Sequence, residues 1–434
     1  MAQNPIIRNQ YTADPTVRVF NGKLYLFPSH DIPVPPNKNL CENWFCMSDY
    51  HVFSSENLND WTDHGAIISQ EKVAWIDAST YSMWAPDCVE RNGKYYFYFP
   101  AIRKPASNSK DKQYGVGVAI AHKPEGPYNV QRAPIANING IDPNVFIDTD
   151  GQAYIYWAEN WGNHRIMGAK LSDNMLEIAS EPIEIENLPT KGLKEGPFVF
   201  KRRGLYYLTY PHVENKIERL EYAIGKHPLG PFEVKGVIMD ESLLKCWTNH
   251  QSVVSYKGQW YLFYHQNEYS PTDDKRRSVC VDSLFFNPDG TIQKVTATRR
   301  GVGITNATQP IELARYSSKN IDGISTLFVN PARPFEGWKT DFEHKNAWVC
   351  YNGVSFDKSE KRVQVKTLSP KGGKIRICLD SKKGKTIAQL NIPKSKEWKI
   401  TETNLSTQVS GLNNLYIISD SNDNIEVDWI QFVE

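Results

Sequence analysis

Short aromatic-rich strands, each entered through a glycine turn, recur along about the first 300 residues of the chain. The five copies are FNGKLYLFPSHD (20–31), RNGKYYFYFPA (91–101), DTDGQAYIYWAEN (148–160), KRRGLYYLTYPHV (201–213) and YKGQWYLFYHQN (256–267). A tight turn that leads into a β-branched or aromatic strand is the usual signal of a hairpin. We therefore expect one hairpin at each copy, and the frequent Gly and Pro residues between copies argue against long helices.

A second hairpin is predicted between successive copies. The segments GVAIAHKPEGPYNV (117–130) and EYAIGKHPLGPFEV (221–234) share one frame, and residues 52–65 and 279–292 occupy equivalent places. Two hairpins make four strands, and four-stranded units that repeat at this spacing are typical of propeller blades. The pattern predicts an all-β chain with a five-bladed β-propeller. A β-sandwich of similar length would have no reason to repeat five times.

The repeat stops near residue 310, where Lys and Ser become more frequent and short alternating strands follow. These strands are read at 348–356, 361–369, 373–380, 385–392, 415–420 and 425–432. They predict a β-sandwich (jelly-roll) domain, in which Trp348 is expected to belong to the core. We expect two domains, a propeller over residues 1–305 and a sandwich over residues 306–434, as the length of 434 residues also suggests.

Charge and composition exclude several classes of partner. A net charge of +1, without a run of Lys or Arg, gives no basis for binding nucleic acid. No apolar run approaches the roughly 18 residues that a membrane span needs. Seven scattered cysteines without C-x-x-C spacing argue against a zinc site or a disulfide framework, so free buried thiols are expected, although Cys41 and Cys46 could pair.

One position of the repeat carries candidate chemistry. Eight or nine residues before each turn glycine stand Asp14-Pro15, Ala85-Pro86, Asp142-Pro143, Glu195-Gly196-Pro197 and His250-Gln251. The first strand of every propeller blade lines the central channel, so these positions should converge around one axis. Asp-Pro alone is common in turns. Three acids at one repeat position need a chemical reason, because clustered carboxylates repel one another and are costly to desolvate.

Glycoside hydrolysis supplies such a reason. One carboxylic acid protonates the leaving oxygen, while a second carboxylate activates water or attacks carbon. A neighbouring carboxylate raises the pKa of the acid and keeps it protonated near neutral pH. Three carboxylates can therefore divide into an acid, a base and a group that tunes the acid.

At these residues the chain resembles glycoside hydrolase family 43, which comprises five-bladed propeller enzymes that act with inversion. The matching segments, in family order, are YTADPTV (11–17), WAPDCV (84–89), GIDPNVFIDTDG (140–151), KEGPFVFKRRGLYYLTY (194–210), NHQSVV (249–254) and RSVCVDSLFFNPDGTI (277–292). The resemblance implies that Asp14 is the general base, Glu195 the general acid and Asp142 the carboxylate that tunes and orients the acid.

The resemblance also implies roles around these acids. Arg277, or its neighbour Arg276, corresponds to an arginine that contacts the sugar or the catalytic acids, and Trp84 is expected in the substrate-binding wall of the pocket. His250 corresponds to a histidine beside a central calcium ion or water cluster. No cofactor is required for the chemistry, and a structural calcium is carried over from the family only.

The C-terminal stretches AWVCYNGVSF, GGKIRICLDSKKGKTIAQLNIP and NIEVDWIQF resemble family 6 carbohydrate-binding modules. The resemblance implies that Trp398 stacks on a sugar and that Asn424 hydrogen-bonds to it. An acidic pair usual at the start of these modules has only Glu312 as a counterpart, since Ala314 replaces the second acid. The sandwich could equally brace the propeller without binding sugar.

The sequence thus predicts an enzyme that removes α-L-arabinofuranosyl or β-D-xylosyl residues from plant polysaccharide such as arabinoxylan. The alternatives are another propeller glycosidase, acting on galactan, arabinan or fructan, and a non-catalytic sugar-binding protein. The expected partner is a plant cell-wall polysaccharide or oligosaccharide, with no nucleic acid and no membrane, and we expect a monomer. A secreted or periplasmic location is expected, and a cytoplasmic one stays open because MAQNPIIRNQ lacks an export signal.

Overall fold

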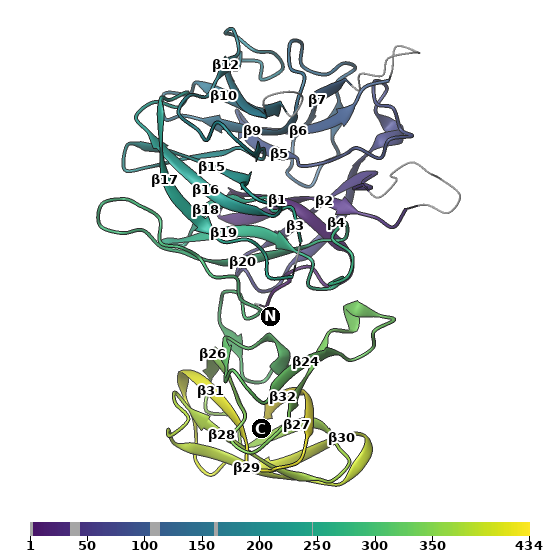
Figure 1. The fold of residues 1–434 in the computed structure, drawn as a ribbon, viewed down its shortest axis with the longest axis vertical. Coiled ribbons are helices and arrows are strands. Elements are labelled where there is room, and N and C mark those ends of the chain that lie inside the picture. Colours follow the sequence, from purple (N-terminus) through teal and green to yellow (C-terminus); the bar gives the residue numbers. More distant parts are fainter. Residues whose placement is uncertain (1–2, 35–43, 105–112, 160–163, 245) are drawn as a thin grey trace. The chain divides into compact units, whose positions relative to one another are not determined.

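The computed structural model describes residues 3–34, 44–104, 113–159, 164–244 and 246–434. These residues form two compact units (Figure 1). One unit comprises Ile7–Glu56 and Trp61–Thr296, and the other comprises Met1–Ile6, Asn57–Asp60 and Ala297–Glu434. The chain passes from the first unit to the second at residue 297, which precedes the domain boundary that the sequence predicts at 305–306.

The first unit is the predicted five-bladed propeller, built from five antiparallel sheets. The first blade contains β1 (Tyr11–Phe20), β2 (Lys23–Asp31), β3 (Asp49–Ser55) and β4 (Thr62–Ser69), and the second contains β5 (Asp87–Arg91), β6 (Lys94–Ile102), β7 (Tyr114–Ala121) and β8 (Asn129–Val130). The third contains β9 (Ile141–Ile147), β10 (Ala153–Glu159), β11 (Arg165–Lys170) and β12 (Ile183–Glu184). The fourth contains β14 (Phe198–Arg202), β15 (Leu205–Val213), β16 (Glu218–Gly225) and β17 (Phe232–Met239), with β13 (Leu193–Lys194) also paired to β15, and the fifth contains β18 (Ser252–Tyr256), β19 (Gln259–Gln266) and β20 (Ser278–Leu284).

The first strands of the five sheets close a ring around the propeller axis. Strand β1 contacts β5, β5 contacts β9, β9 contacts β14, β14 contacts β18, and β18 returns to β1. The predicted hairpin glycines Gly22, Gly93, Gly151, Gly204 and Gly258 all adopt positive φ between 73° and 86°, which glycine tolerates without strain. The hairpin prediction is thereby confirmed for every blade.

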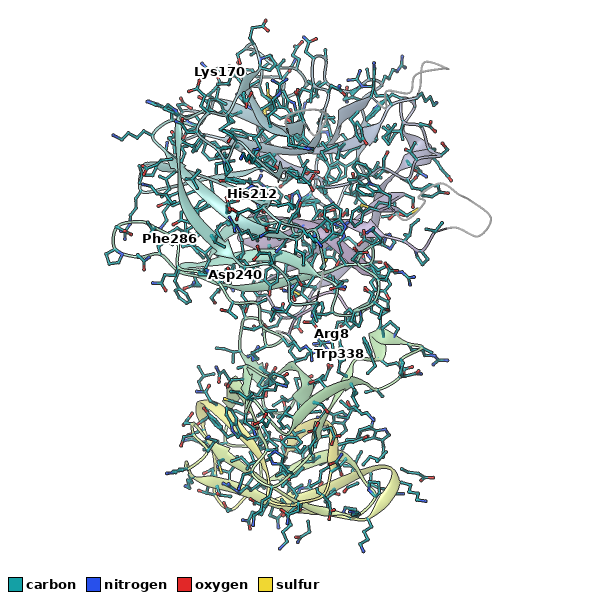
Figure 2. The ribbon with its side chains drawn as sticks, in the orientation of Figure 1. Arg8, Lys170, His212, Asp240, Phe286 and Trp338 are labelled. Atoms are coloured by element: carbon teal, nitrogen blue, oxygen red, sulfur yellow. The ribbon has the colours of Figure 1, made fainter. Side chains whose placement is uncertain are left out.

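The fifth sheet differs from the expectation of four strands. After β20 the chain makes only an isolated bridge between Phe286 and Ile292. The backbone N–H of Ile292 donates to the hydroxyl of Tyr222, and that of Val295 donates to the carbonyl of Ile238 in β17. Phe286, labelled in Figure 2, packs edge-on against Tyr207. The outer segment of the fifth blade therefore bonds to the fourth blade in place of β20.

A buried polar network joins the blades around the axis. The guanidinium group of Arg18 in β1 donates to the Asp87 carboxylate of β5 at 2.6 Å and to the Val145 carbonyl of β9 at 3.0 Å. The side chain of Asn144 donates to Asp87 at 2.9 Å and accepts the backbone N–H of Val199 in β14 at 2.8 Å. These bonds fasten four of the five first strands to one another, which fixes the positions of the residues that these strands carry.

The second unit is a sandwich of two sheets around one apolar core. The predicted strands are confirmed as β26 (Trp348–Phe356), β27 (Arg362–Ser369), β28 (Gly373–Leu379), β29 (Thr386–Ile392), β31 (Gly411–Ser419) and β32 (Ile425–Val433). The sequence reading missed β24 (Ile324–Phe328), β25 (Trp338–Phe342) and β30 (Ser395–Asn404). The expectation for Trp348 is wrong, because this residue is only half-buried and packs on Tyr416 beneath the ammonium group of Lys382.

Residues Gln3–Ile6 belong to the sandwich unit. The side chain of Gln3 donates to the hydroxyl of Tyr351 at 2.6 Å, and the side chain of Asn4 donates to the carbonyl of Thr298 at 2.7 Å. Buried Arg315 donates to the carbonyl of Asn4 at 2.5 Å. We call Gln3–Ile6 the N-terminal strap.

The cysteines follow the expectation with one exception. Five are free and buried, namely Cys88, Cys246, Cys280, Cys350 and Cys378. Cys46 is disulfide-bonded, so the expectation of a free thiol is wrong there, and Cys41 lies outside the described residues. Within the described ranges, no helix is both long enough and apolar enough to span a bilayer.

Candidate active site

The ring of first strands carries the acids that the repeat singled out. Asp14 lies in β1, Asp142 lies in β9, and Glu195 stands between β13 and β14. Asp14 and Asp142 are each 5% exposed, while Glu195 is half-buried. The negative charges of Glu195 and Asp14 both act on Asp142, so the three groups from three blades face one interior region.

The backbone turns sharply at each of these positions. Asp14 and Asp142 have φ values of 47° and 54°, and both strands lose their regular register at the Asp-Pro pair. Such bulges redirect a side chain that would otherwise follow the pleat of the sheet. In the fourth blade Gly196 takes the positive φ, 52°, and Glu195 precedes it. Positive φ is costly for residues other than glycine, and such strain is typical of functional sites.

The carboxylate of Asp14 is held by a buried arginine. Nη1 of Arg277 lies 2.9 Å from Oδ1 of Asp14, and the hydroxyl of Ser29 donates to Oδ2 at 2.5 Å. The same guanidinium group forms a two-pronged pair with Asp31 at 2.9 Å. Burial alone would raise the pKa of Asp14, but Arg277, two neighbouring histidines and the hydrogen bond from Ser29 together outweigh it and hold the pKa at about 2. Asp14 is therefore ionised at neutral pH.

The geometry resolves the arginine doublet. Arg277 is buried and its donors reach Asp14, Asp31 and Thr248. Arg276 is partly exposed and pairs with Asp273. Arg277 is thus the arginine beside the acids, and its predicted contact with the sugar stays a prediction.

Asp142 has the opposite electrostatic environment. Burial raises the pKa of Asp142 well above its usual range, and the charges of Glu195 and Asp14 raise it further. The backbone N–H of Gly196 donates to Oδ2 of Asp142 at 3.0 Å. This bond ties the third blade to the residue that follows Glu195, so Asp142 orients the segment that carries the predicted acid.

A fourth acid, Glu218 at the start of β16, was missed by the sequence reading. Its carboxyl group is 1% exposed and hydrogen-bonds to that of Glu195. Oε2 accepts the backbone N–H of Asn249 at 2.5 Å. Two carboxyl groups can bond only through a proton, and burial followed by the charge of Glu195 raises the pKa of Glu218 well above its usual range. The raised pKa values of Asp142 and Glu218 favour their protonated forms, so the carboxyl groups beside Glu195 can hold a proton.

Nothing in the repeat pointed to Glu218. The first strand of each blade supplied the other candidates, whereas Glu218 stands on the third strand of the fourth blade, in KIERLEY. Ser29 and Asp31 were likewise outside the repeat position, on β2.

His250 lies on the ring next to the fourth blade. A Cβ atom added at Gly196 would come within 2.9 Å of the His250 ring, so the two residues are in close contact. Burial lowers the pKa of His250 to about 4, and its imidazole is therefore neutral at neutral pH. A second imidazole, that of His265, accepts the backbone N–H of Asp14 at 3.1 Å through Nδ1.

Aromatic side chains flank the acids. The ring of Trp84 packs on Tyr114 with centroids 5.6 Å apart, in a cluster that includes Ile141, the residue before Asp142. Phe45 covers the guanidinium group of Arg277 at 4.3 Å. Trp247 was missed by the sequence reading, and it contacts Phe45 and the half-exposed ring of Trp44 at 5.9 Å each.

The sugar-binding candidates of the sandwich lie on a charged surface. Trp398 in β30 is half-buried, and the ammonium groups of Lys366 and Lys339 lie 5.5 and 6.0 Å from its ring centroid. Asn424 is exposed and its side-chain amide donates to Asp341 at 3.1 Å. Their predicted contacts with sugar stay predictions. Glu312 is paired with Arg315 at 2.6 Å.

Comparisons with known proteins show to which families the two parts of the chain are similar. The family described as Glycosyl hydrolases family 43 matches residues 2–292, and the family described as Carbohydrate binding module (family 6) matches residues 337–434. A Xylosidase/arabinosidase 43A from Humicola insolens is 36% identical over 66% of this chain and 98% of its own length. An arabinoxylan arabinofuranohydrolase from Bacillus subtilis is 26% identical over 93% of this chain and 86% of its own.

The fold is also found in solved structures. A β-xylosidase/α-arabinofuranosidase from a compost microbial metagenome, in a calcium-free complex with xylotriose, superimposes with a TM-score of 0.60. It is 32% identical to this chain and covers 68% of it, with 97% of its own length aligned.

Proposed function

The chain belongs to glycoside hydrolase family 43 and is a glycosidase, and on that premise we propose that it removes α-L-arabinofuranosyl or β-D-xylosyl residues from plant cell-wall polysaccharide with inversion. The observation that carries the proposal is the convergence of Asp14, Asp142 and Glu195 from three blades, with opposite electrostatic surroundings. An ionised base and a protonated acid are what inverting hydrolysis requires.

In this proposal Asp14 is the general base. Its carboxylate stays ionised beside Arg277, so it accepts a proton from the water that attacks the anomeric carbon. Glu195 donates a proton to the leaving oxygen as the glycosidic bond breaks. Asp142 and Glu218 lie beside Glu195 and favour a protonated carboxyl group there before the bond is cleaved.

The substrate class rests on the relatives and on the aromatic residues of the site. Relatives that share family and fold are named xylosidases, arabinosidases and arabinoxylan arabinofuranohydrolases. Trp84, Trp247 and Trp44 offer flat apolar rings near the acids, and such rings stack on pyranose and furanose faces. We propose that the sandwich assists by binding the polymer through Trp398 and Asn424.

A calcium ion at His250 remains a proposal, and the described residues do not form a protein cage for it. Calcium takes six to eight oxygen ligands. His250 offers a nitrogen, the nearby Asp14 carboxylate is held by Arg277 and Ser29, and His250 is not part of the metal-type cluster found among the described residues. No step of the reaction is routed through such an ion.

We further propose that the enzyme works as a monomer outside the cytoplasm, because a cell-wall polymer is too large to enter a cell. Among the described residues, no helix could span a membrane. Size-exclusion chromatography with light scattering checks the monomer.

The decisive test is Glu195→Ala, assayed on arabinoxylan and on a nitrophenyl arabinofuranoside and xyloside. Loss of a general acid should lower kcat on the polymer by about 10²–10⁴-fold and spare the nitrophenyl substrates, whose leaving groups need little protonation. Glu181→Ala, at an exposed position, is the matched control.

Proton NMR of the first product formed tests inversion. Appearance of the anomer opposite to that of the substrate supports the assignment of Asp14 as base. A retained anomer would identify a different propeller glycosidase class, and unchanged polymer turnover in Glu195→Ala would remove Glu195 from the acid role.

A further inference from the structure

A second cluster of chemistry-bearing side chains lies in the first blade, on β2, β3 and β4. It consists of His30, Asp49 and His51, with Asp63 behind His51. The side chains of the three central residues are 18–21% exposed, so a small ion in solution can reach them. Of all groups of His, Cys, Asp and Glu within the described ranges, this one alone brings three ligand atoms within 4.8 Å of one another.

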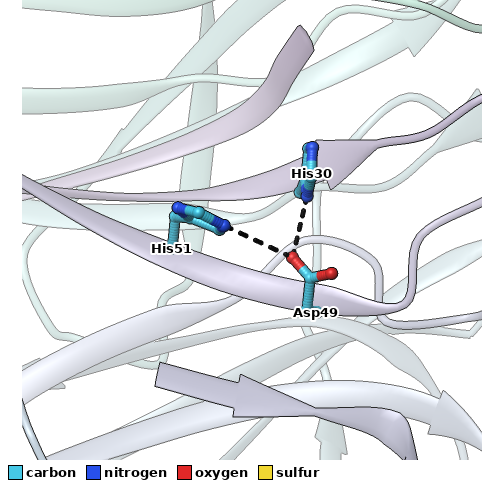
Figure 3. A group of neighbouring side chains, drawn as sticks. All are labelled: His30, Asp49 and His51. Carbon is cyan, nitrogen blue, oxygen red and sulfur yellow. Dashed lines mark hydrogen bonds and ion pairs between the residues drawn. The ribbon is translucent and has the colours of Figure 1, made fainter. Parts of the chain in front are cut away.

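Two imidazole nitrogens converge on one carboxylate oxygen (Figure 3). Nδ1 of His30 lies 2.8 Å from Oδ1 of Asp49, and Nε2 of His51 lies 3.8 Å from the same atom. Ligand atoms around a tetrahedral zinc ion, each about 2.0–2.1 Å from the metal, are roughly 3.3 Å apart. The observed separations bracket that value, so small side-chain rotations would complete the geometry.

The outer partners of these residues favour metal binding. Nδ1 of His51 lies 3.1 Å from Oδ1 of Asp63, so a proton on Nδ1 would donate to that carboxylate and leave the lone pair of Nε2 directed at Asp49. Two lone pairs that face each other repel, and a proton or a metal cation between them removes that repulsion. A carboxylate that orients a histidine through its other nitrogen is the usual second layer of a zinc site. Asp49 is oriented in the same manner by the hydroxyl of Ser48, at 3.0 Å.

The backbone also pre-forms the group. Asp49 and His51 are two residues apart on β3 and so share one face of the sheet. His30 stands on β2, which pairs with β3 in the register Ser29 to Tyr50. A site on paired strands is held more firmly than one on a loop.

We propose that His30, Asp49 and His51 bind one zinc ion, with water as the fourth ligand. Two imidazoles and one carboxylate suit zinc and similar transition metals, whereas calcium prefers oxygen ligands alone. The neighbours of His30 in β2 are Ser29 and Asp31, which hold Asp14 and Arg277. The metal would therefore fix the strand that positions the proposed base. This inference does not depend on the identity of the sugar or on the hydrolytic mechanism.

Isothermal titration calorimetry of the full chain, freed of any affinity tag and treated with chelator, should show one zinc ion bound per chain. Because ligand loss removes a metal–nitrogen bond, His30→Ala and His51→Ala should weaken binding by more than about 100-fold. Asp63→Asn should weaken it by about 10–100-fold, as loss of an outer partner does. His122→Ala, at an exposed histidine elsewhere in the propeller, should not change it.

X-ray absorption of the zinc-loaded wild-type protein keeps the proposal testable if a variant fails to fold. Two imidazoles within a shell of nitrogen and oxygen atoms at about 2.0–2.1 Å support it. A chain that binds no zinc at micromolar concentration, or one whose affinity is the same in His51→Ala, would show that the cluster is a hydrogen-bonded chain and overturn the proposal.

Discussion

Asp14 and Asp142 share an Asp-Pro motif, a positive φ and an exposure of 5%, yet their neighbours drive their protonation in opposite directions. Asp14 faces a guanidinium group, whereas Asp142 faces two further acids. Desolvation is common to both, so the difference in pKa comes from the neighbouring charges. At the scale of single residues, the roles follow from what each carboxylate touches.

Replacing Arg277 by Ala should move the acidic limb of kcat/KM to higher pH. Without the guanidinium group, burial would raise the pKa of Asp14 from about 2, and a base that is protonated at higher pH is inactive there. We expect a loss of about 10²-fold or more at pH 6, since leaving a buried charge unpaired is strongly unfavourable. Arg276→Ala is the control, because Arg276 and its partner Asp273 both remain partly in contact with solvent, and its pH profile should match the wild type.

Glu218→Gln should move the basic limb of kcat/KM to lower pH by about one pH unit. The substitution keeps the size of the side chain and removes the carboxyl group that shares a proton with Glu195. The acid cluster then loses its proton more easily, so activity falls at a lower pH. A pH profile of Glu218→Gln that coincides with those of the wild type and of the exposed control Glu214→Gln would exclude this role.

The same substitution makes a prediction about stability. The pKa of Glu218 in the folded protein is raised above its value in the unfolded chain, which is about 4.3. Protonated Glu218 therefore contributes to the stability of the fold below that pH, and this contribution is lost as the pH rises through the folded pKa. Glu218→Gln should therefore raise the melting temperature at pH 8 relative to the wild type and do so less at pH 5. Thermal scans at the two pH values measure the difference.

At the scale of the elements, the fourth blade depends on one glycine. A Cβ atom at Gly196 would lie 2.9 Å from both the His250 ring and Cδ of Pro211, and φ there is 52°. Gly196→Ala should destabilise the fold by about 1–3 kcal/mol and displace Glu195, with a further loss of kcat. Gly204→Ala, also at positive φ but with nothing within 4 Å of the added atom, should cost stability alone. Chemical unfolding and kcat measurements separate the two effects.

The repeat allowed the hairpins of the propeller to be predicted from the sequence. The strands that were missed or wrongly predicted lack such a local signal. Turn glycines and aromatic strands marked every hairpin because both are local signals. The polar, largely exposed strand β30 has no such signal, and the last strand of the fifth blade was lost to bonds with Tyr222 and Ile238 in the neighbouring blade. These contacts depend on distant parts of the chain.

The residues of the candidate site also fall into a group that the repeat indicated and a group that it did not. Asp14, Asp142 and Glu195 were found because each occupies one position of the repeat. Glu218 and Trp247 lie outside it and enter the site only through the arrangement of the blades. The cluster of His30, Asp49 and His51 was missed for the same reason, since its residues come from two strands, β2 and β3.

At the scale of the whole molecule, the N-terminal strap should contribute measurably to the sandwich unit. Asn4→Ala removes the partly buried bond to the carbonyl of Thr298, and the loss should cost about 1 kcal/mol. Hydrogen exchange should then speed up near residues 298–305 and not in the propeller strands. Asn9→Ala, at an exposed position of the propeller unit, is the control, and equal exchange in the two variants would contradict the prediction.

The strap also bears on the order in which the protein is assembled on the ribosome. Gln3 is separated from its partner Tyr351 by 348 positions, and Asn4 from Thr298 by 294. Gln3 and Asn4 must therefore wait for partners that are synthesised only after all five blades. A nascent chain halted after residue 296 would hold every strand of the propeller but neither Thr298 nor Tyr351, so the strap should be open to proteases until those partners are made.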